Sequence, residues 1–151
     1  MTPQETLEQV KIAFTYVSDP DKDRWTLPPM HGPFEGDCEE FALAVLLRHA
    51  ESESAMFAML NDGTAKIERV LTDRGVGHAV LWLKDWGYVD SIHQYWRERR
   101  LFEHKQTFSA RDVRRKLAGK KVKEPANKKM LVLAAMIGAA ALALAFGGFG
   151  Q

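Results

Sequence analysis

The charged residues of this 151-residue chain are distributed so unevenly that they limit it to one globular domain with an appendage. Residues 1–96 carry 8 lysines and arginines against 16 acidic residues, and residues 97–129 carry 13 against 4. Residues 130–151 carry no charged side chain. Segments of such different charge have different roles. We expect a folded domain over residues 1–108, a basic helix and linker over 109–129, and an apolar helix over 130–150.

Helix signals recur along the first two segments. Capping boxes mark helix starts at residues 2–5 and 109–112, and apolar residues at helical spacing extend the first of these helices to Val17. Two more helices are predicted, over about 38–50 and from Ser52 or Ser54 to a stop signal at residues 61–63. These helices account for the α part of an α+β fold.

Strand signals follow the helices. Residues 78–83 and 88–92 are β-rich runs separated by a turn at residues 84–87, which predicts a hairpin. Residues 64–72 fit a helix or a strand, with a slight preference for a strand. The pattern therefore indicates an antiparallel hairpin that follows the helices.

The cysteine of this chain, Cys38, follows the turn-forming residues 28–33 and starts a predicted helix. A thiol in the first turn of a helix faces unpaired backbone N–H groups and the positive end of the helix dipole, and both favour the thiolate. The alternative is a small buried hydrophobe. A single cysteine excludes an internal disulfide, and the polar amino terminus does not resemble a signal peptide, so we expect a reducing compartment.

Three residues follow one another in the order of a papain-type nucleophile system. Cys38 starts a helix, His78 starts a strand, and Asp90 lies on the next strand. In such a system the thiol attacks a carbonyl, the histidine takes and returns the proton, and the acid orients the imidazole. The order therefore predicts catalysis at these three residues.

The hairpin geometry leaves the orienting residue open. A three-residue loop at 85–87 would pair Trp82 with Asp90 and place the Asp90 Cα about 13 Å from that of His78. A bulge, strong twist or wider loop would close this gap. Otherwise Gln94, or His93 in a shifted register, would orient His78.

An oxyanion hole is expected beside the thiol. The backbone N–H of Cys38 and a donor from the preceding loop would form it. Trp25 is the side chain to consider there, and the alternative role for it is packing in the core.

The string Gly36-Asp37-Cys38-Glu39-Glu40-Phe41-Ala42, together with His78-Ala79-Val80-Leu81 and Tyr88-Val89-Asp90, resembles the bacterial transglutaminase-like cysteine peptidases. Tyr16, Asp19 and Trp25 add to the resemblance, which covers roughly residues 5–95. It implies a papain-like fold with helices on an antiparallel sheet. It also implies Cys38 as nucleophile, His78 as general base and Asp90 as orienting acid, acting on a protein or peptide substrate.

The same resemblance raises the question of calcium. In calcium-dependent members of that family the two acids flanking the cysteine take part in ion binding, and Asp37 and Glu39 hold those positions here. The alternative is that both acids interact with the helix dipole. Two carboxylates are too few for calcium without further oxygen ligands. No cofactor is required by the predicted chemistry.

The carboxyl-terminal segment predicts a membrane anchor. Residues 130–146 lack charged side chains, and a helix over residues 130–150 would span about 31 Å, enough for a bilayer core. Lysines before it would keep the domain on the cytoplasmic side, or within a virion, and would bind anionic lipid. Small residues at every fourth position from Ala135 to Gly147 would suit a helix–helix contact in a homo-oligomer. Nucleic-acid binding is disfavoured because no recognition motif accompanies the lysines.

Three function classes fit these patterns. The first is a membrane-associated cysteine hydrolase that cleaves a peptide or amide bond through a Cys38 thioester. The second is a transamidase or acyltransferase that uses the same thioester. The third is a non-catalytic papain-fold assembly module whose apolar tails oligomerise or enter a membrane, in a bacteriophage or bacterial envelope.

Overall fold

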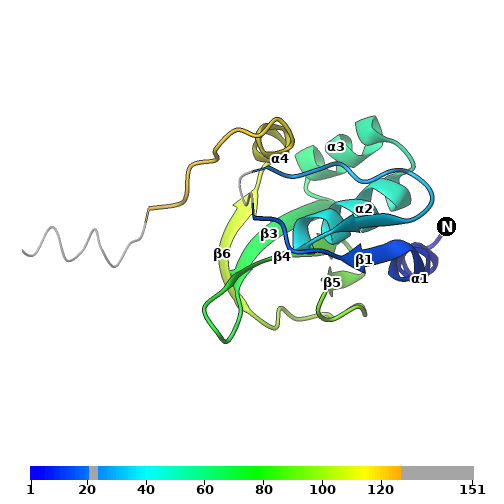
Figure 1. The fold of residues 1–151 in the computed structure, drawn as a ribbon, viewed down its shortest axis with the longest axis horizontal. Coiled ribbons are helices and arrows are strands. Elements are labelled where there is room, and N and C mark those ends of the chain that lie inside the picture. Colours follow the sequence, from blue (N-terminus) through cyan, green and yellow to red (C-terminus); the bar gives the residue numbers. More distant parts are fainter. Residues whose placement is uncertain (21–23, 127–151) are drawn as a thin grey trace, which may run out of the picture.

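The structure, a computed structural model, describes residues 1–20 and 24–126, and it is an α+β fold with helices packed on a small antiparallel sheet (Figure 1). In chain order the elements of this part are α1 (Pro3–Ala13), β1 (Phe14–Tyr16), β2 (Phe34–Gly36), α2 (Cys38–Ala50), α3 (Glu53–Asp62), β3 (Ala65–Leu71), β4 (Gly77–Leu83), β5 (Gly87–Val89), β6 (Glu103–Phe108) and α4 (Ala110–Leu117). The helix–strand order matches the sequence patterns except at three strands that were not predicted, β1, β2 and β6.

Each helix begins where a side chain caps it. Thr2, Asp37 and Ser109 form capping boxes at α1, α2 and α4, and Ser52 accepts a hydrogen bond from the Ala55 N–H at α3. These caps satisfy backbone N–H groups that the first helical turn leaves without partners. The predicted positions of α2, α3 and α4 are confirmed.

The first helix is shorter than its apolar spacing predicts. It ends at Ala13, and Phe14–Tyr16 forms a strand that pairs in parallel with Phe34–Gly36. Aromatic and β-branched residues favour strands, and Phe14 packs on the rings of Phe34 and Phe41. The prediction of helix up to Val17 is therefore wrong, because a distant segment supplies a strand partner.

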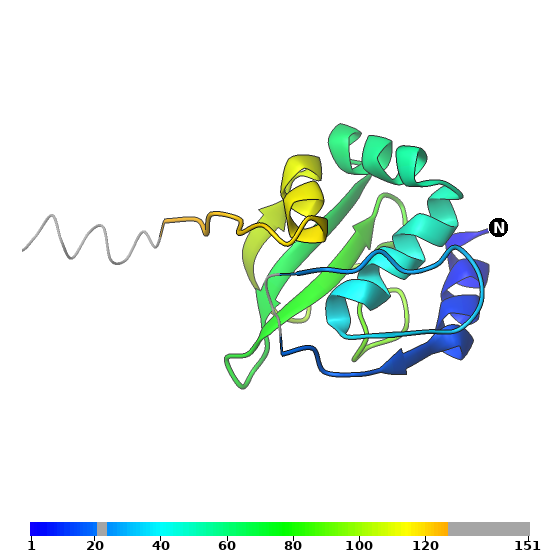
Figure 2. The same ribbon diagram turned by 45° about the horizontal axis from the view of Figure 1, so that its top comes forward.

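The main sheet has the strand order β5-β4-β3-β6, and all its pairs are antiparallel. Residues 65–71 form the strand that the sequence slightly favoured. Helix α2 contacts β4, α3 contacts β3, and α4 contacts β6, so these helices cover one side of the sheet (Figures 1 and 2). Seven consecutive residues of α2, Phe41 to Leu47, are buried and form the centre of the core.

The hairpin register differs from the expected one. Leu83 pairs with Gly87 and Leu81 with Val89, so the loop is residues 84–86 and not 85–87. Asp85 and Gly87 both take positive φ, which makes this tight loop possible. Moving the loop by one residue moves the register by two. The return strand ends at Val89, so the prediction that Asp90 lies on this strand is wrong: Asp90 is the first residue after it.

The basic helix is packed onto the domain. Val113 of α4 is fully buried, and the Trp25 N–H donates to the Lys116 carbonyl at 3.1 Å. No helix within residues 1–20 and 24–126 is long and apolar enough to cross a membrane. The predicted apolar helix over 130–150 lies outside the residues that the structure describes.

Candidate active site

The turn before Cys38 is built by the residues on either side of it. Asp37 caps α2 by accepting the Glu39 N–H at 3.1 Å, and Glu40 accepts the Asp37 N–H at 3.1 Å and the Thr26 N–H at 2.9 Å. A Cβ on Gly36 would lie 2.4 Å from the Glu40 Cβ, so only glycine fits. Most of the Gly-Asp-Cys-Glu-Glu string is thus explained by the geometry that places the thiol at the first helical position.

Burial raises the pKa values of both capping acids. The pKa of Asp37 rises to about 6, mainly because it is buried, with its contact to Glu39 adding to the effect. The pKa of Glu40 rises to about 7, also mainly through burial, and its hydrogen bond with Asp37 contributes. The surroundings of the thiol are therefore poorly solvated and rich in acids.

The Cys38 thiol donates to the Glu39 carboxylate at 3.2 Å. Burial raises the pKa of this thiol strongly, and the negative charges of Glu39 and Asp37 raise it further, although the Ala79 backbone N–H acts in the opposite direction. The expectation of a lowered thiol pKa is wrong for this arrangement, because burial and acidic neighbours outweigh the helix terminus.

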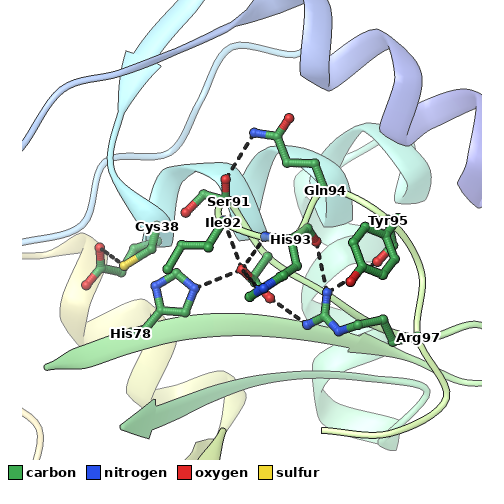
Figure 3. Close-up of polar contacts among 10 residues, drawn as sticks. Cys38, His78, Ser91, Ile92, His93, Gln94, Tyr95 and Arg97 are labelled. Atoms are coloured by element: carbon green, nitrogen blue, oxygen red, sulfur yellow. Dashed lines mark hydrogen bonds and ion pairs between the residues drawn. The ribbon is translucent and has the colours of Figure 1, made fainter. Parts of the chain in front are cut away.

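His78 and Asp90 form a buried pair beside the thiol. His78 Nε2 lies 3.0 Å from Asp90 Oδ1, and the side chains are 6% and 0% exposed. The Phe102 ring packs edge-on against the imidazole, with ring centroids 5.7 Å apart. In Figure 3 the Cys38 sulfur lies beside the His78 ring, and its hydrogen bond runs to Glu39. Because Nε2 contacts Asp90, the ring presents Nδ1 to the cysteine.

Asp90 is held by further donors that the sequence patterns did not indicate. Its Oδ1 accepts the N–H groups of Ile92 and His93, each at 2.9 Å, and its Oδ2 accepts Arg97 Nη2 at 2.5 Å. Burial alone would raise the pKa of Asp90, but hydrogen bonds from His78, His93 and Arg97 outweigh it and lower the pKa to about 2. Asp90 therefore stays ionised and orients His78.

The other residues considered for orienting His78 or for the oxyanion hole have different roles. Gln94 donates to the Ser91 carbonyl at 3.1 Å, and the His93 ring nitrogen Nδ1 is 3.7 Å from Asp90 Oδ1. Trp25 is buried in the core with its ring edge-on to Phe108, centroids 4.9 Å apart. The structure therefore brings Asp90, and neither Gln94 nor His93, to the His78 ring, and it gives Trp25 the packing role.

A cavity of about 730 Å³ opens at the thiol. Cys38, Asp37 and His78 line it together with apolar side chains that include Phe14, Tyr16, Val76, Ile92 and Phe102. Tyr16, Val76 and Ile92 are each more than half exposed. This cavity, the thiol cavity, is large enough for a segment of a substrate and offers it an apolar surface.

The acids beside the thiol do not fit a calcium site. One ligand atom from each of Asp37, Cys38 and Glu39 lies within 4.8 Å of the others. Calcium takes six to eight oxygen ligands, and a thiol is a poor partner for this hard cation. The Asp37 carboxylate is also engaged as the helix cap.

One residue of this site, Arg97, was missed in the sequence. Arg97 lies seven residues after Asp90, beyond the end of the predicted hairpin, and this position is the signal that could have indicated it. The signal is weak because Arg97 belongs to a run of basic residues, which is typical of a solvated surface. Only the tertiary fold shows that its guanidinium turns inward, because Tyr88 and Arg97 form a backbone bridge.

The chain was also compared with known proteins. No protein-family model matches it, and a search of curated proteins found no match.

Proposed function

We propose that this protein is a cysteine hydrolase that cleaves a peptide or amide bond through a thioester on Cys38. The observation that carries the proposal is the buried His78–Asp90 pair, 3.0 Å apart, on the rim of the cavity that holds the thiol. A buried carboxylate on one nitrogen of an imidazole fixes its tautomer and leaves the other nitrogen to accept a proton. The resemblance to transglutaminase-like cysteine peptidases supports the same roles.

In the first half of the reaction, the Cys38 sulfur attacks the substrate carbonyl carbon and its proton passes to His78 Nδ1. The carbonyl π pair moves to oxygen and forms a tetrahedral oxyanion. When this intermediate collapses, the C–N bond breaks and the leaving nitrogen takes the proton from His78. The product that remains is a thioester between Cys38 and the acyl group.

Water completes the cycle. His78 takes a proton from the attacking water, the new C–O bond forms, and the C–S bond then breaks. The sulfur recovers its proton from His78, and the acyl group leaves as a carboxylic acid. Asp90 stabilises the imidazolium that exists in each half of the reaction, since it remains a carboxylate throughout.

The first helical turn offers a donor for the oxyanion. Cys38 is the first residue of α2, so helix geometry gives its backbone N–H no acceptor within the helix. The positive end of the helix dipole lies at the same place. We assign this N–H to the oxyanion hole.

The proposal is tested with an activated acyl ester, p-nitrophenyl acetate, under single-turnover conditions. The wild-type protein should release a burst of nitrophenol and carry an acetyl group on Cys38, located by mass spectrometry of peptides. Cys38→Ala should give no burst, and His78→Ala should slow acylation by at least about a hundredfold. Acylation at the rate of a free thiol in the wild type, unaffected by His78→Ala, would refute the proposal.

A further inference from the structure

The basic segment continues past α4 along the domain and reaches the neighbourhood of His78. We call residues 121–124 the strap. Its backbone is fixed at two points: Arg115 donates twice to the Lys121 carbonyl, at 3.1 and 2.9 Å, and Gln106 Nε2 donates to the Lys123 carbonyl at 3.2 Å. The sequence patterns indicated only a charged linker here.

Two side chains of the strap also hold it on the sheet. Val122 is partly buried and packs against the hydrophobic core. Glu124 Oε1 accepts Arg69 Nη1 of β3 at 2.6 Å. The strap is therefore held on the domain surface by its backbone carbonyls, by one apolar side chain and by one ion pair.

The strap encloses a second cavity, of about 510 Å³, next to the thiol cavity. Lys121, Val122 and Glu124 line one part of it, and Glu39 and His78 line another. Val76, Gly77 and His78 line both cavities, so the two adjoin at the imidazole. A chain bound across His78 would therefore enter the thiol cavity on one side and the strap cavity on the other.

The two cavities differ in chemistry. Among the described residues that line the thiol cavity, Lys11 and Arg74 are balanced by Asp37 and Asp73. Among the described residues that line the strap cavity, Arg69, Lys116 and Lys121 are basic and Glu39 and Glu124 are acidic. Arg69 and Glu124 pair with each other, which leaves Lys116 and Lys121 against Glu39. A surface with a net positive charge favours an acidic partner.

We propose that the strap is a specificity element: residues 121–124 form the wall of a subsite that binds an acidic segment of an extended polypeptide on one side of the bond presented to Cys38. This inference rests on the proposed function for its reaction. Binding at the subsite does not need the thiol, so the subsite can be tested apart from catalysis.

The test is peptide binding to the Cys38→Ala protein, measured by fluorescence anisotropy with two labelled peptide pools. Both pools carry the same apolar residues, and one carries aspartates where the other carries lysines. The Cys38→Ala protein should prefer the acidic pool, and Val122→Asn, which replaces the apolar side chain that packs the strap against the core without adding a charge, should remove that preference.

Two substitutions to glutamine distinguish the effect of strap docking on peptide binding from the effect of net charge. Arg69→Gln and Glu124→Gln both break the ion pair but change the net charge in opposite directions. Both should weaken binding of the acidic pool, by about two- to fivefold, the range expected for an exposed pair. The double exchange Arg69→Glu with Glu124→Arg should restore it. Glu103→Gln, which breaks an exposed pair with Lys105 on β6, serves as the control and should change nothing.

Opposite effects of Arg69→Gln and Glu124→Gln would overturn the strap proposal, because charge alone would explain them. Equal binding of the two pools, or binding of neither, would overturn it as well. These results leave the acyl-transfer test on the wild-type protein unaffected, so failure of the subsite and failure of the proposed function are distinguishable.

Discussion

At the scale of single residues, the site places a well-oriented histidine beside a thiol that is not yet ionised. Asp90 is fixed by His78, two backbone N–H groups and Arg97, so it orients the imidazole as a permanent carboxylate. The Cys38 thiol donates a hydrogen bond to the Glu39 carboxylate, and burial with nearby acids raises the thiol pKa. In the proposed reaction, proton transfer to His78 must therefore accompany the attack on substrate.

Glu39 should accordingly restrain the reactivity of the thiol. In Glu39→Gln the negative charge beside the sulfur is lost, so the thiol pKa should fall and alkylation by iodoacetamide at pH 7 should accelerate about three- to tenfold. Glu53→Gln, at the first position of α3 with no cysteine beside it, is the matched control. An unchanged or slower alkylation of Glu39→Gln would show that Glu39 does not hold the thiol in its protonated form.

Asp90 should make stability depend on pH in the acid range. Its pKa falls from 3.8 to about 2 on folding, so its stabilising effect is complete above about pH 4 and is lost as the pH falls toward 2. The difference in unfolding free energy between wild type and Asp90→Asn should therefore be about 2 kcal/mol larger at pH 7 than at pH 2. Urea unfolding at a series of pH values measures it, and a constant difference would contradict the assigned hydrogen bonds.

At the scale of elements, the site depends on the register of the β4–β5 hairpin and on the chain that returns beside it. Tyr88 and Arg97 exchange backbone hydrogen bonds at 2.7 and 2.9 Å, which brings the Arg97 side chain to Asp90. Gly87 makes this approach possible: its φ is +89°, and a Cβ there would lie 2.0 Å from the Arg97 carbonyl oxygen.

Gly87→Ala should therefore disturb both stability and the site. Gly63 has a similar φ of +81° but open space around it, so Gly63→Ala carries only the cost of the backbone conformation, about 1 kcal/mol. Gly87→Ala adds a backbone clash and should cost at least about 2 kcal/mol more and slow acylation of Cys38. Thermal unfolding of the two variants provides the comparison, and equal losses would mean that the Gly87 contact is unimportant.

The sequence predicted those elements whose signals are local. Capping side chains and apolar spacing located α2, α3 and α4, and the β-rich runs located β4 and β5. Strand β6 was missed because Glu103–Phe108 is mostly polar and exposed, and its structure comes from pairing with β3. Order along the chain pointed to Cys38, His78 and Asp90, but the Asp90 distance depended on a one-residue difference in loop position. Arg97 became visible only through its backbone bridge to Tyr88.

At the scale of the whole molecule, the folded unit extends beyond the acidic part of the chain. Helix α4 contacts α3 and β6, its Arg114 lies over the Phe57 ring at 3.7 Å, and the strap follows it along the sheet. The basic segment therefore belongs partly to the domain, whereas the membrane anchor over residues 130–150 stays a prediction.

Two deletions separate these regions. Removing residues 130–151 should leave the melting temperature unchanged and move the protein from the membrane fraction to the soluble fraction. Removing residues 109–151 should expose the part of the core that Val113 covers and lower the melting temperature by at least about 10 °C, because α4 packing is lost. Continued membrane association after the shorter deletion would refute the anchor.

The most direct test of the proposed catalytic site is the rate at which an amide-mimicking, thiol-directed probe labels Cys38 in the wild type, His78→Ala and Asp90→Asn. If the three residues act together, the wild type should react at pH 7 much faster than a free thiol. Both variants should then lose at least about a hundredfold in rate, since each removes the oriented base. Labelling of the wild type at the free-thiol rate, with neither substitution changing it, would contradict a Cys38–His78–Asp90 catalytic site.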